Sequence, residues 1–463
     1  MSAYLNVYIT SLSGYFLGIF LALFALLGFV CLFLPEDGDL FGVIVKVRAI
    51  LMFLFNFTAF LCICFESGDM KMMITFVVSQ ILMLGIMLIG GILYPEAERI
   101  LPENMCMLLS IGFVILTRLN INKSLKQLLI VTVSFIISMG VPFAIRKMRF
   151  LYNFKWIYAS IGIAALGLVL LAGQITYGAN ISYTVGGITF QPSEIIKIVF
   201  VFYIASGFVR ARGMQEVIEV SIIAGVHVII LVLSKDLGSA LIYAITYMVM
   251  IFVATGNFLY IVGCAALGIA AAFVAYSKFE HVRDRVSAWI DPWTTIDNTG
   301  YQITQSLFAL STGSTWGQGL MKGNPTSIPF VEDDFIFSAI VEEMGFVVGI
   351  SLIAICVLSF LCAIKLAYSL NSMFYRLLAT GLGISYIIQV FVTIGGGVKF
   401  IPLTGVTLPF VSYGGSSVLT SILLFEVLIG VSMVQLDEKA FYEKQTKIDN
   451  KNDTGTGNES GHK

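Results

Sequence analysis

The sequence contains few of the charged side chains with which soluble domains face water. Asp, Glu, Lys and Arg make up 12% of its 463 residues, whereas hydrophobic residues make up 58%. Such a composition is typical of a chain whose main solvent is lipid. The net charge of -1 also leaves no basic face that would neutralise phosphates, so we expect no nucleic acid among the partners.

Metal ligands of the soft type are scarce as well. The chain has three histidines and seven cysteines. The cysteines fall in or beside apolar runs without paired metal-ligand spacing, and even Cys62 and Cys64 lie within one apolar run. We therefore interpret the cysteines as core packing.

Long apolar runs are what the sequence has in abundance. Runs long enough to cross a bilayer as helices occur at about residues 13–35, 49–66, 72–94, 104–119, 125–145, 155–175, 193–210, 216–234, 237–255, 257–278, 335–366, 376–398 and 413–436. The sequence therefore predicts an all-α, polytopic integral membrane protein with about thirteen transmembrane helices and one large extracellular loop.

Basic residues in the short connections predict how these spans are oriented, because cytoplasmic connections are enriched in Lys and Arg. One side collects Lys46, Arg48, Arg99, Arg146, Lys147, Arg149, Lys155, Arg210, Arg212, Lys365, Arg376, Lys439, Lys444 and Lys447. That side is predicted to be cytoplasmic, with the N-terminus outside and the C-terminus inside. Arg118, Lys123 and Lys126 lie on the other side, where they either snorkel to lipid headgroups or hold an anionic ligand.

The densest group of carboxylates lies where one predicted span begins, in the segment IPFVEDDFIFSAIVEEMG. Glu332, Asp333 and Asp334 are consecutive, and Glu342 and Glu343 follow in the same run. Ionisable groups at the edge of a hydrocarbon layer lose hydration, so they need a partner or a function. The structural interpretation is interfacial caps plus a buried pair bound to basic side chains. The functional interpretation is a reactive carboxylate.

A second polar intrusion is TFQPSEIIKIVF, residues 189–200. Pro192 suits the first turn of a helix, and Glu194 and Lys197, at i and i+3, share one helix face. Mutual neutralisation is the simpler explanation of the pair, and a charged wall of a cavity is the alternative.

Two connections on the predicted external side are unusual. Residues 279–334 form the longest one and contain three of the four tryptophans, Trp289, Trp293 and Trp316. Residues 395–417 are too rich in Gly, Pro and Ser for a continuous helix. Non-helical backbone beside a membrane is tolerated where it is buried in protein or lines a wet cavity, so residues 395–417 are predicted to line one.

These pieces occur together, in the same order, in a known family. The chain resembles the SEDS proteins (shape, elongation, division and sporulation), the group that contains RodA, FtsW and SpoVE. The matching segments are GGITFQPSEIIKI (186–198), KDLGSALI (235–242), RVSAWIDPW (285–293), GYQITQSLFALSTGSTWGQGL (300–320), PFVEDDFIFSAIVEEMGFVVG (329–349) and PLTGVTLPFVSYGGSS (402–417).

The resemblance implies a division of the chain into three parts. Residues 101–436 correspond to the ten-helix polymerase core of the family, and residues 1–100 are a three-helix N-terminal extension for which the family offers no role. Residues 437–463 are polar, low in aromatics and predicted to be a disordered cytoplasmic tail.

The resemblance also implies an activity. The family polymerises peptidoglycan glycan strands from lipid II outside the cytoplasmic membrane, in elongation, division or sporulation. It usually works with a class B penicillin-binding protein, which is a transpeptidase. The family's essential acid, the Asp directly before Phe-Ile-Phe, falls on Asp334, whereas Asp333 falls where the family is less constrained. Asp334 is therefore the expected general base.

Further residues are implied to bind the lipid-linked substrate. They are Glu194, Lys197, Lys126, Lys399, Gln305, Ser412 and Ser416. Because the leaving group is undecaprenyl diphosphate, cationic side chains or a divalent cation, Mg²⁺ or Mn²⁺, are expected to absorb the developing charge. The family often has Lys where this chain has Thr404, and Lys399 is a candidate to replace that charge.

Two other functions are compatible with the sequence. A lipid II flippase would also bury charged residues among many helices, and a non-catalytic scaffold that activates a penicillin-binding protein would need no reactive carboxylate. The sequence has no obvious inverted repeat, and its charge is concentrated at one face. These features favour an enzyme that acts on an external substrate.

Overall fold

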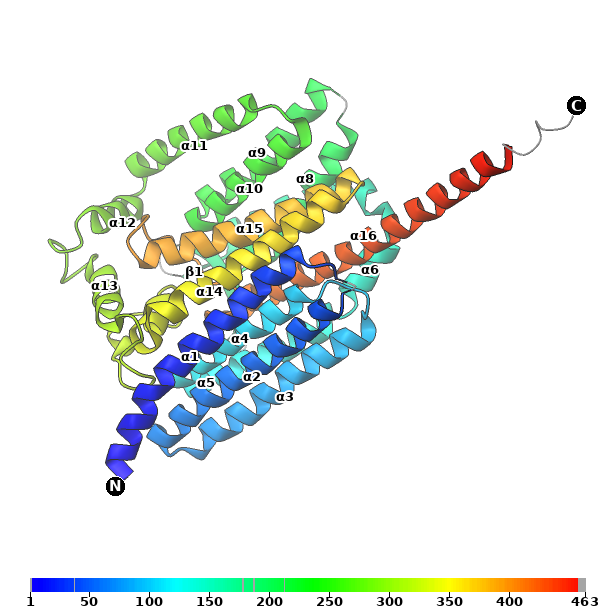
Figure 1. The fold of residues 1–463 in the computed structure, drawn as a ribbon. Helices are drawn as coiled ribbons and strands as arrows, with labels where there is room; N and C mark the ends of the chain where they lie inside the picture. The colour runs from blue at the N-terminus through cyan, green and yellow to red at the C-terminus, as the bar shows by residue number, and fades with distance from the viewer. Residues whose placement is uncertain (1, 37, 177–178, 186–187, 212, 457–463) are drawn as a thin grey trace, which may run out of the picture.

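The computed structural model describes residues 2–36, 38–176, 179–185, 188–211 and 213–456. Long helices run side by side in a bundle, with shorter helices and irregular segments at its ends (Figure 1). In chain order the helices are α1 (Ser2–Phe33), α2 (Asp39–Ser67), α3 (Met70–Leu93), α4 (Ile100–Leu119), α5 (Ile121–Ser138), α6 (Val141–Lys147), η1 (Arg149–Asn153), α7 (Lys155–Ala172), α8 (Pro192–Arg210), α9 (Met214–Leu233), α10 (Leu237–Thr255), α11 (Leu259–Lys278), α12 (Glu280–Ile290), α13 (Tyr301–Gly313), η2 (Pro325–Ser327), α14 (Ile336–Ser369), α15 (Met373–Gly397) and α16 (Gly415–Thr456).

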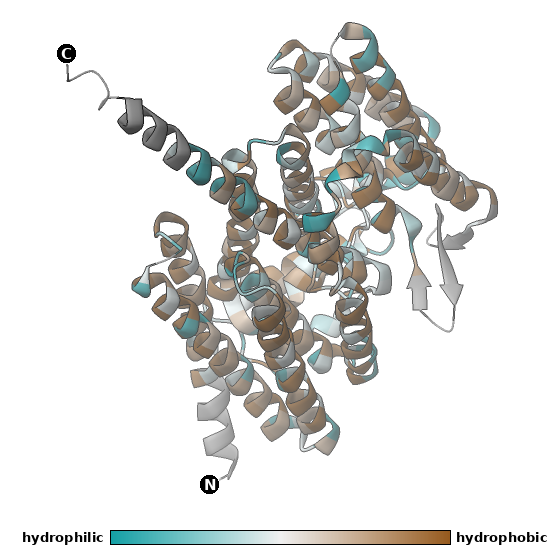
Figure 2. Cartoon of the chain, turned by 90° about the vertical axis from the view of Figure 1, so that its right-hand side faces the viewer, coloured by the Kyte–Doolittle hydropathy of each residue, from teal (hydrophilic) through white to brown (hydrophobic). Residues whose placement is uncertain are grey.

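The predicted spans coincide with these helices. Within the described residues, 12 helical stretches are long and apolar enough to cross a membrane, with α5 and α6 forming one of them. The shorter apolar helix α7 occupies the place of the remaining predicted span. Backbone polar groups find no water in lipid, so an apolar run must satisfy them internally as a helix. Hydrophobic residues cover the flanks of the bundle in Figure 2, and the polytopic, helical class is confirmed.

A small antiparallel sheet between α7 and α8 was not predicted. Its strands are β1 (Gln174–Thr176), β2 (Ala179–Val185) and β3 (Ile188–Phe190), in the order β1-β2-β3. Short strands joined by glycine-containing connections pair locally as hairpins. That signal is weak beside the long apolar runs that determine the rest of the fold, so the sequence alone does not predict the sheet.

The three N-terminal helices pack on the rest of the bundle. α1 lies along α14, and both α2 and α3 lie along α4. Arg48 of α2 is fully buried, and its guanidinium donates to Glu103 Oε2 and to Asn104 Oδ1 of α4, each at 2.6 Å. The prediction that Arg48 is a loop cation is therefore wrong. Arg48 lies inside the bundle because the Glu103 carboxylate compensates its charge.

α14 contains a break that its apolar sequence does not reveal. Gly345, in the third turn of α14, has φ +88°, a conformation that suits glycine. Residues 314–319 lie against the break, and their backbone supplies the missing hydrogen bonds. These run from Gln318 N to Glu342 O, from Gly319 N to Glu343 O, from Phe346 N to Ser314 O and from Val347 N to Thr315 O.

The segment between α15 and α16 is irregular, as predicted, but the C-terminal tail differs from the prediction. α16 continues to Thr456, and Figure 1 shows its last turns leaving the bundle. The span at the start of α16 already provides the helix nucleus, so propagation into the following Glu, Lys, Ala and Gln residues is favourable. Residues 457–463 of the predicted tail lie outside the described residues.

Candidate active site

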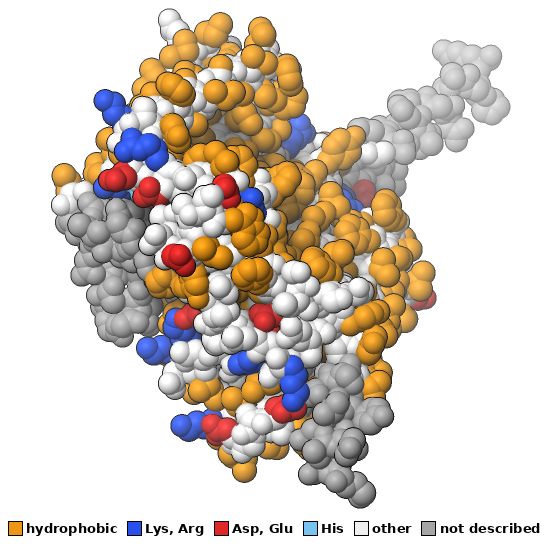
Figure 3. All heavy atoms as spheres, turned by 90° about the vertical axis from the view of Figure 1, so that its left-hand side faces the viewer, with side chains coloured by type: hydrophobic (Ala, Val, Ile, Leu, Met, Phe, Trp, Pro, Cys, Tyr) orange, Lys and Arg blue, Asp and Glu red, His pale blue; other side chains and the backbone are white. Residues whose placement is uncertain are grey.

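Most of the predicted site residues lie at one end of the bundle. α12, α13 and two irregular segments, residues 314–335 and 398–414, are gathered there, opposite the end from which α16 leaves (Figure 1). We call this end the loop face. Figure 3 views the molecule from that side and shows acidic and basic side chains spread among uncharged polar surface, with hydrophobic side chains around them. The predicted carboxylate site is thus on a polar end of an apolar bundle.

Ion pairs account for some of the acids that the sequence analysis singled out. Glu332 pairs with Lys123 of α5, and Glu343 pairs with Arg118 of α4 at 2.8 Å. Lys123 also lies over the ring of Tyr413, 5.2 Å from its centroid. Glu332 and Glu343 therefore fit the structural interpretation, and their partners are two of the three basic residues predicted on the external side.

Asp333 and Asp334 differ from these acids, because neither forms an ion pair within the described part of the chain. Both side chains are partly accessible. Loss of hydration, opposed by Lys123 and reinforced by Glu332, raises the pKa of Asp333 to about 6. Loss of hydration and the charge of Asp333, opposed by Arg285, raise the pKa of Asp334 to about 7. A carboxylate with this pKa is suited to exchange a proton near neutral pH.

Arg285 of α12 faces Asp334, and the sequence analysis did not select it. Its Nη1 donates to Thr404 O at 3.0 Å. A Cβ built on Gly405 would lie 3.5 Å from Arg285 Nη2 and 3.7 Å from Asp334 Oδ2, so both charged groups border one small space. Arg285 stands in the RVSAWIDPW motif, but only the fold shows that α12 lies over the segment after α15.

The backbone of the acidic triplet is fixed by the segment 398–414. Tyr413 N donates to Glu332 O at 2.9 Å, and Ser412 Oγ donates to Asp333 O. The Gln127 side chain of α5 in turn donates to Ser412 O at 3.1 Å. The backbone before Asp334 is therefore held by Ser412 and Tyr413, which Gln127 supports in turn, and this suits a preorganised site.

Glu194 and Lys197 of α8 form the predicted pair deep in the bundle. Lys197 Nζ lies 3.0 Å from Glu194 Oε2, and the two residues are 4% and 7% exposed. Lys197 also donates to Gln389 Oε1, and Gln389 Nε2 donates to Thr407 O at 3.1 Å. The pair is neutralised internally, and Gln389 connects it to the segment 398–414 that borders Asp334.

The hydroxyls of Ser412 and Ser416 form hydrogen bonds within the protein. Ser412 Oγ bonds the backbone of Asp333 and accepts from Leu408 N at 3.0 Å. Ser416 Oγ accepts from Gln191 N at 3.1 Å. In this structure both serines hold the backbone that frames the site.

Lys399, Gln305 and Lys126 occupy separate positions at the loop face. Lys399 is partly exposed with φ +61°, and its carbonyl accepts from Trp289 Nε1 at 3.2 Å. Gln305 is partly exposed on α13, and Lys126 is exposed on α5. These three remain predicted contacts of a substrate, whereas Arg285 is the cation that the fold brings to Asp334.

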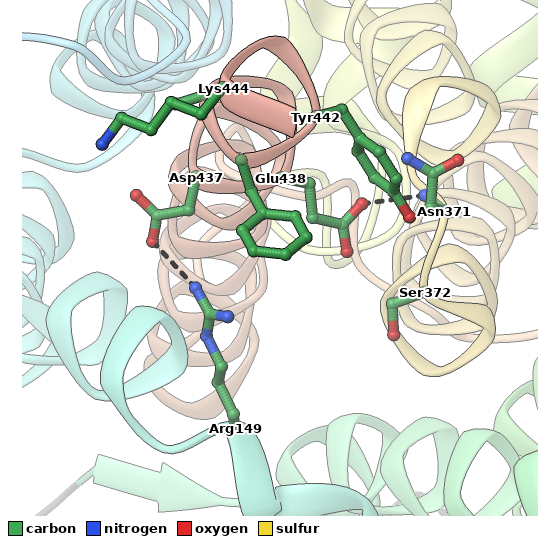
Figure 4. A pocket seen from close by; sticks show the side chains of 9 residues that line it. Arg149, Asn371, Ser372, Asp437, Glu438, Tyr442 and Lys444 are labelled. Carbon is green, nitrogen blue, oxygen red and sulfur yellow. Dashed lines mark hydrogen bonds and ion pairs between the residues drawn. The ribbon is translucent and has the colours of Figure 1, made fainter. Parts of the chain in front are cut away.

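A separate hollow lies at the opposite end of the bundle (Figure 4). Its lining residues are Arg149, Asn371, Ser372, Asp437, Glu438, Ala440, Phe441, Tyr442 and Lys444. Arg149 pairs with Asp437 at 3.4 Å, and Asn371 N donates to Glu438 at 2.8 Å. The hollow contains none of the predicted site residues, and its polar contacts attach the start of the α16 extension to neighbouring connections.

With the helical bundle, the loop-face carboxylates and the buried Glu194–Lys197 pair described, comparison with known proteins defines the class of membrane protein. The model of the cell cycle protein family of FtsW, RodA and SpoVE matches residues 99–436. The chain belongs to this family, which is the SEDS family indicated by its motifs.

Some of the similar proteins are named RodA and others FtsW. The peptidoglycan glycosyltransferase RodA of Mycobacterium tuberculosis is 35% identical over 271 residues, which cover 55% of this chain and 58% of that protein. A "probable peptidoglycan glycosyltransferase FtsW" of a Geobacter species is 32% identical over 268 residues, covering 56% of this chain and 73% of that protein. The match thus spans little more than half the length of the mycobacterial relatives.

Solved structures show the same fold. Rod shape determining protein RodA of Thermus thermophilus superposes with a TM-score of 0.54 at 22% identity, covering 73% of this chain and 97% of that one. A chain from "Structural coordination of polymerization and crosslinking by a peptidoglycan synthase complex" gives a TM-score of 0.63 at 24% identity, covering 73% of this chain and 98% of that one.

Proposed function

We propose that the protein is a peptidoglycan glycosyltransferase that polymerises lipid II, with undecaprenyl diphosphate as the leaving group. The observation that carries the proposal is Asp334, a partly accessible carboxylate whose pKa is raised to about 7 and which faces Arg285 at the loop face. Family membership and the glycosyltransferase names of the relatives support it.

In the proposed reaction Asp334 is the general base. Its carboxylate accepts the proton of an acceptor sugar hydroxyl while the hydroxyl oxygen attacks the anomeric carbon of the donor. The bond from that carbon to the diphosphate oxygen breaks, and its electron pair leaves with the diphosphate. Arg285, next to Asp334, stabilises the negative charge that develops there, as a preorganised cation does most effectively in a site with little water.

A divalent cation is the other expected source of such stabilisation. Within the described residues there is no group of three or more His, Cys, Asp or Glu side chains placed to hold a metal ion. Mg²⁺ is commonly held by one or two carboxylates together with substrate phosphates and water, so an ion here would take further ligands from the diphosphate of the substrate. Among the chain's own groups we assign charge stabilisation to Arg285, with Lys399 and Lys126 as further cations at the loop face.

The proposed setting is the outer surface of the cytoplasmic membrane. The loop face is external and α16 leaves into the cytoplasm, an assignment supported by the basic residues that remain after Arg48 is removed from the count. The proposed partner is a class B penicillin-binding protein, supported by the structural similarity to a chain of a peptidoglycan synthase complex. The family includes proteins of elongation, division and sporulation, and the proposal covers all three.

Reconstitution with labelled lipid II tests the function directly. The purified protein in liposomes, with its transpeptidase present, is expected to produce glycan polymer. Redistribution of lipid II between leaflets without polymer would identify a flippase instead. If neither occurs while the transpeptidase is activated, the protein is a scaffold.

A further inference from the structure

Trp316, in the irregular segment before α14, packs on helix α1 of the N-terminal extension. The ring of Trp316 lies 4.8 Å, centroid to centroid, from that of Tyr15 in α1. A Cβ built on Gly14 would come within 2.7 Å of Trp316 O, and one built on Gly18 within 3.0 Å of the indole ring. The two glycines, four residues apart on one helix face, leave room for this close approach.

An ion pair makes a second connection nearby. Lys322 Nζ lies 2.6 Å from Glu66 Oε1, at the end of α2. Trp316 and Lys322 belong to one segment, residues 314–334, which we call the strap. Two helices of the extension, α1 and α2, thus hold the first half of the strap.

The strap ends at the proposed base. Its first part is bonded to the break in α14, Arg118 donates to Gly323 O at 3.1 Å, and the chain then runs to Asp333 and Asp334 directly before α14 begins. The strap therefore returns to the helix that it precedes, with its contacts to α1 and α2 in one half and the two acids at its other end.

The strap also has an unusual backbone that needs external support. Three residues of the strap have positive φ, which residues other than glycine rarely adopt. They are Ser314 (+50°), Met321 (+73°) and Phe330 (+57°). Such conformations persist where the surrounding structure determines them from several sides. For the strap, that surrounding includes α1 and α2.

We propose that the N-terminal three-helix extension is a positioning element for the proposed active site, with Trp316 as its main contact. Seating of Trp316 on Gly14 and Gly18, aided by the Lys322–Glu66 ion pair, keeps the strap ordered and Asp334 in its working position. The positioning role of the extension in catalysis rests on the proposed polymerase function. The anchoring of the strap by α1 and α2 is independent of that function.

Gly18→Leu in the full-length protein tests the proposal, because a Cβ there already meets the Trp316 ring at 3.0 Å and Val347 Cγ1 of α14 at 3.2 Å, so the larger side chain pushes α1 away from both. Gly42→Leu is the matched control, since Gly42 is a glycine of the same extension and a Cβ built there meets nothing within 4 Å. Hydrogen exchange of residues 314–334 in nanodiscs is expected to be at least about threefold faster in Gly18→Leu than in wild type. The kcat of polymerisation is expected to fall about tenfold or more with little change in KM. Gly42→Leu is expected to match wild type in both.

The ion pair provides a second test that does not depend on packing inside the membrane. Glu66→Lys is expected to speed exchange of the strap, and Glu66→Lys combined with Lys322→Glu is expected to restore it. Unchanged exchange in both Gly18→Leu and Glu66→Lys would overturn the anchoring. Faster exchange with unchanged kcat would overturn the positioning role. A wild-type protein that makes no polymer would refute the polymerase function, while the exchange data would still decide the anchoring.

Discussion

Arg285 opposes the two effects that raise the pKa of Asp334. Loss of hydration and the charge of Asp333 disfavour the ionised carboxylate, whereas the Arg285 guanidinium favours it, and the balance is a pKa of about 7. Asp334 lies in the segment directly before α14 and Arg285 in α12, so the fold sets the pKa of Asp334 through two segments that are distant in sequence. Each contributor can be removed separately, and each removal shifts the pKa in a known direction.

The pH profile of polymerisation is expected to follow these directions. In wild type the rate is expected to rise with pH through about 7, because the ionised form of Asp334 is the proposed base. Asp333→Asn removes a charge that raises the pKa, so the acid limb moves to lower pH. Arg285→Gln removes a charge that lowers the pKa, so the limb moves to higher pH while the maximal rate also falls. Initial rates on labelled lipid II between pH 5 and 9, roughly two units to either side of the pKa, check this; shifts in the reverse directions would contradict it.

Asp334→Asn is expected to abolish most activity without changing the fold. The substitution preserves size while removing the basic oxygen, and a general base typically contributes about 10²–10⁴-fold in rate. Asp333→Asn, its matched control, is expected to keep most of the maximal rate. Both purified variants would be compared with the transpeptidase present. An active Asp334→Asn beside an inactive Asp333→Asn would place the base one residue earlier.

Neutralising the Glu194–Lys197 pair separates stability from function. Glu194→Gln alone leaves Lys197 in the bundle without its carboxylate and is expected to cost about 3–5 kcal/mol of unfolding free energy. Glu194→Gln with Lys197→Met removes both charges and should recover most of that stability. We expect the double variant to lose polymerisation about tenfold or more, because the pair connects through Gln389 to the segment beside Asp334. Full activity in a folded double variant would make the pair purely structural.

The Arg48–Glu103 ion pair is expected to hold the N-terminal extension on α4. Arg48→Met leaves a buried carboxylate unpaired, and we expect a loss of about 3–5 kcal/mol in unfolding free energy. Arg48→Met with Glu103→Gln should be much less destabilised. Lys46→Met, an exposed cation of the same helix, is the control and should unfold as wild type does. Unfolding in detergent monitored by circular dichroism provides the comparison; equal unfolding of Arg48→Met and Lys46→Met would argue against this role.

The proposed orientation predicts where the C-terminus lies. A protease site placed after Lys463 should resist protease added to intact cells whose wall has been removed, and it should be cleaved after lysis. An engineered site in the strap, which belongs to the loop face, should behave in the opposite way. Cleavage of the C-terminal site in intact cells would reverse the orientation derived from the basic residues.

The sequence by itself determined the class of the fold. Apolar runs of about twenty residues in lipid have one way to satisfy their backbone, so the spans followed directly from hydropathy. The motifs identified the family, and the acidic triplet and the Glu194–Lys197 pair were visible because charge is rare in such a chain. These are local properties of the sequence, and they can be recognised without knowing which distant residues they contact.

The tertiary structure decided which of these charged groups have partners inside the protein. Lys123 and Arg118 pair with Glu332 and Glu343, and Glu342 accepts from the backbone of Asn324. Of the five acids, Asp333 and Asp334 are then the two without such a partner among those contacts. Arg285 lies near Asp334 only because α12 folds over the segment after α15, where it bonds Thr404 O. Arg48 is a buried ion-pair partner only because α2 packs on α4. Ion pairing between distant elements depends on how the helices pack and on the high free-energy cost of an unpaired charge inside the bundle. Hydropathy and local spacing report neither of these.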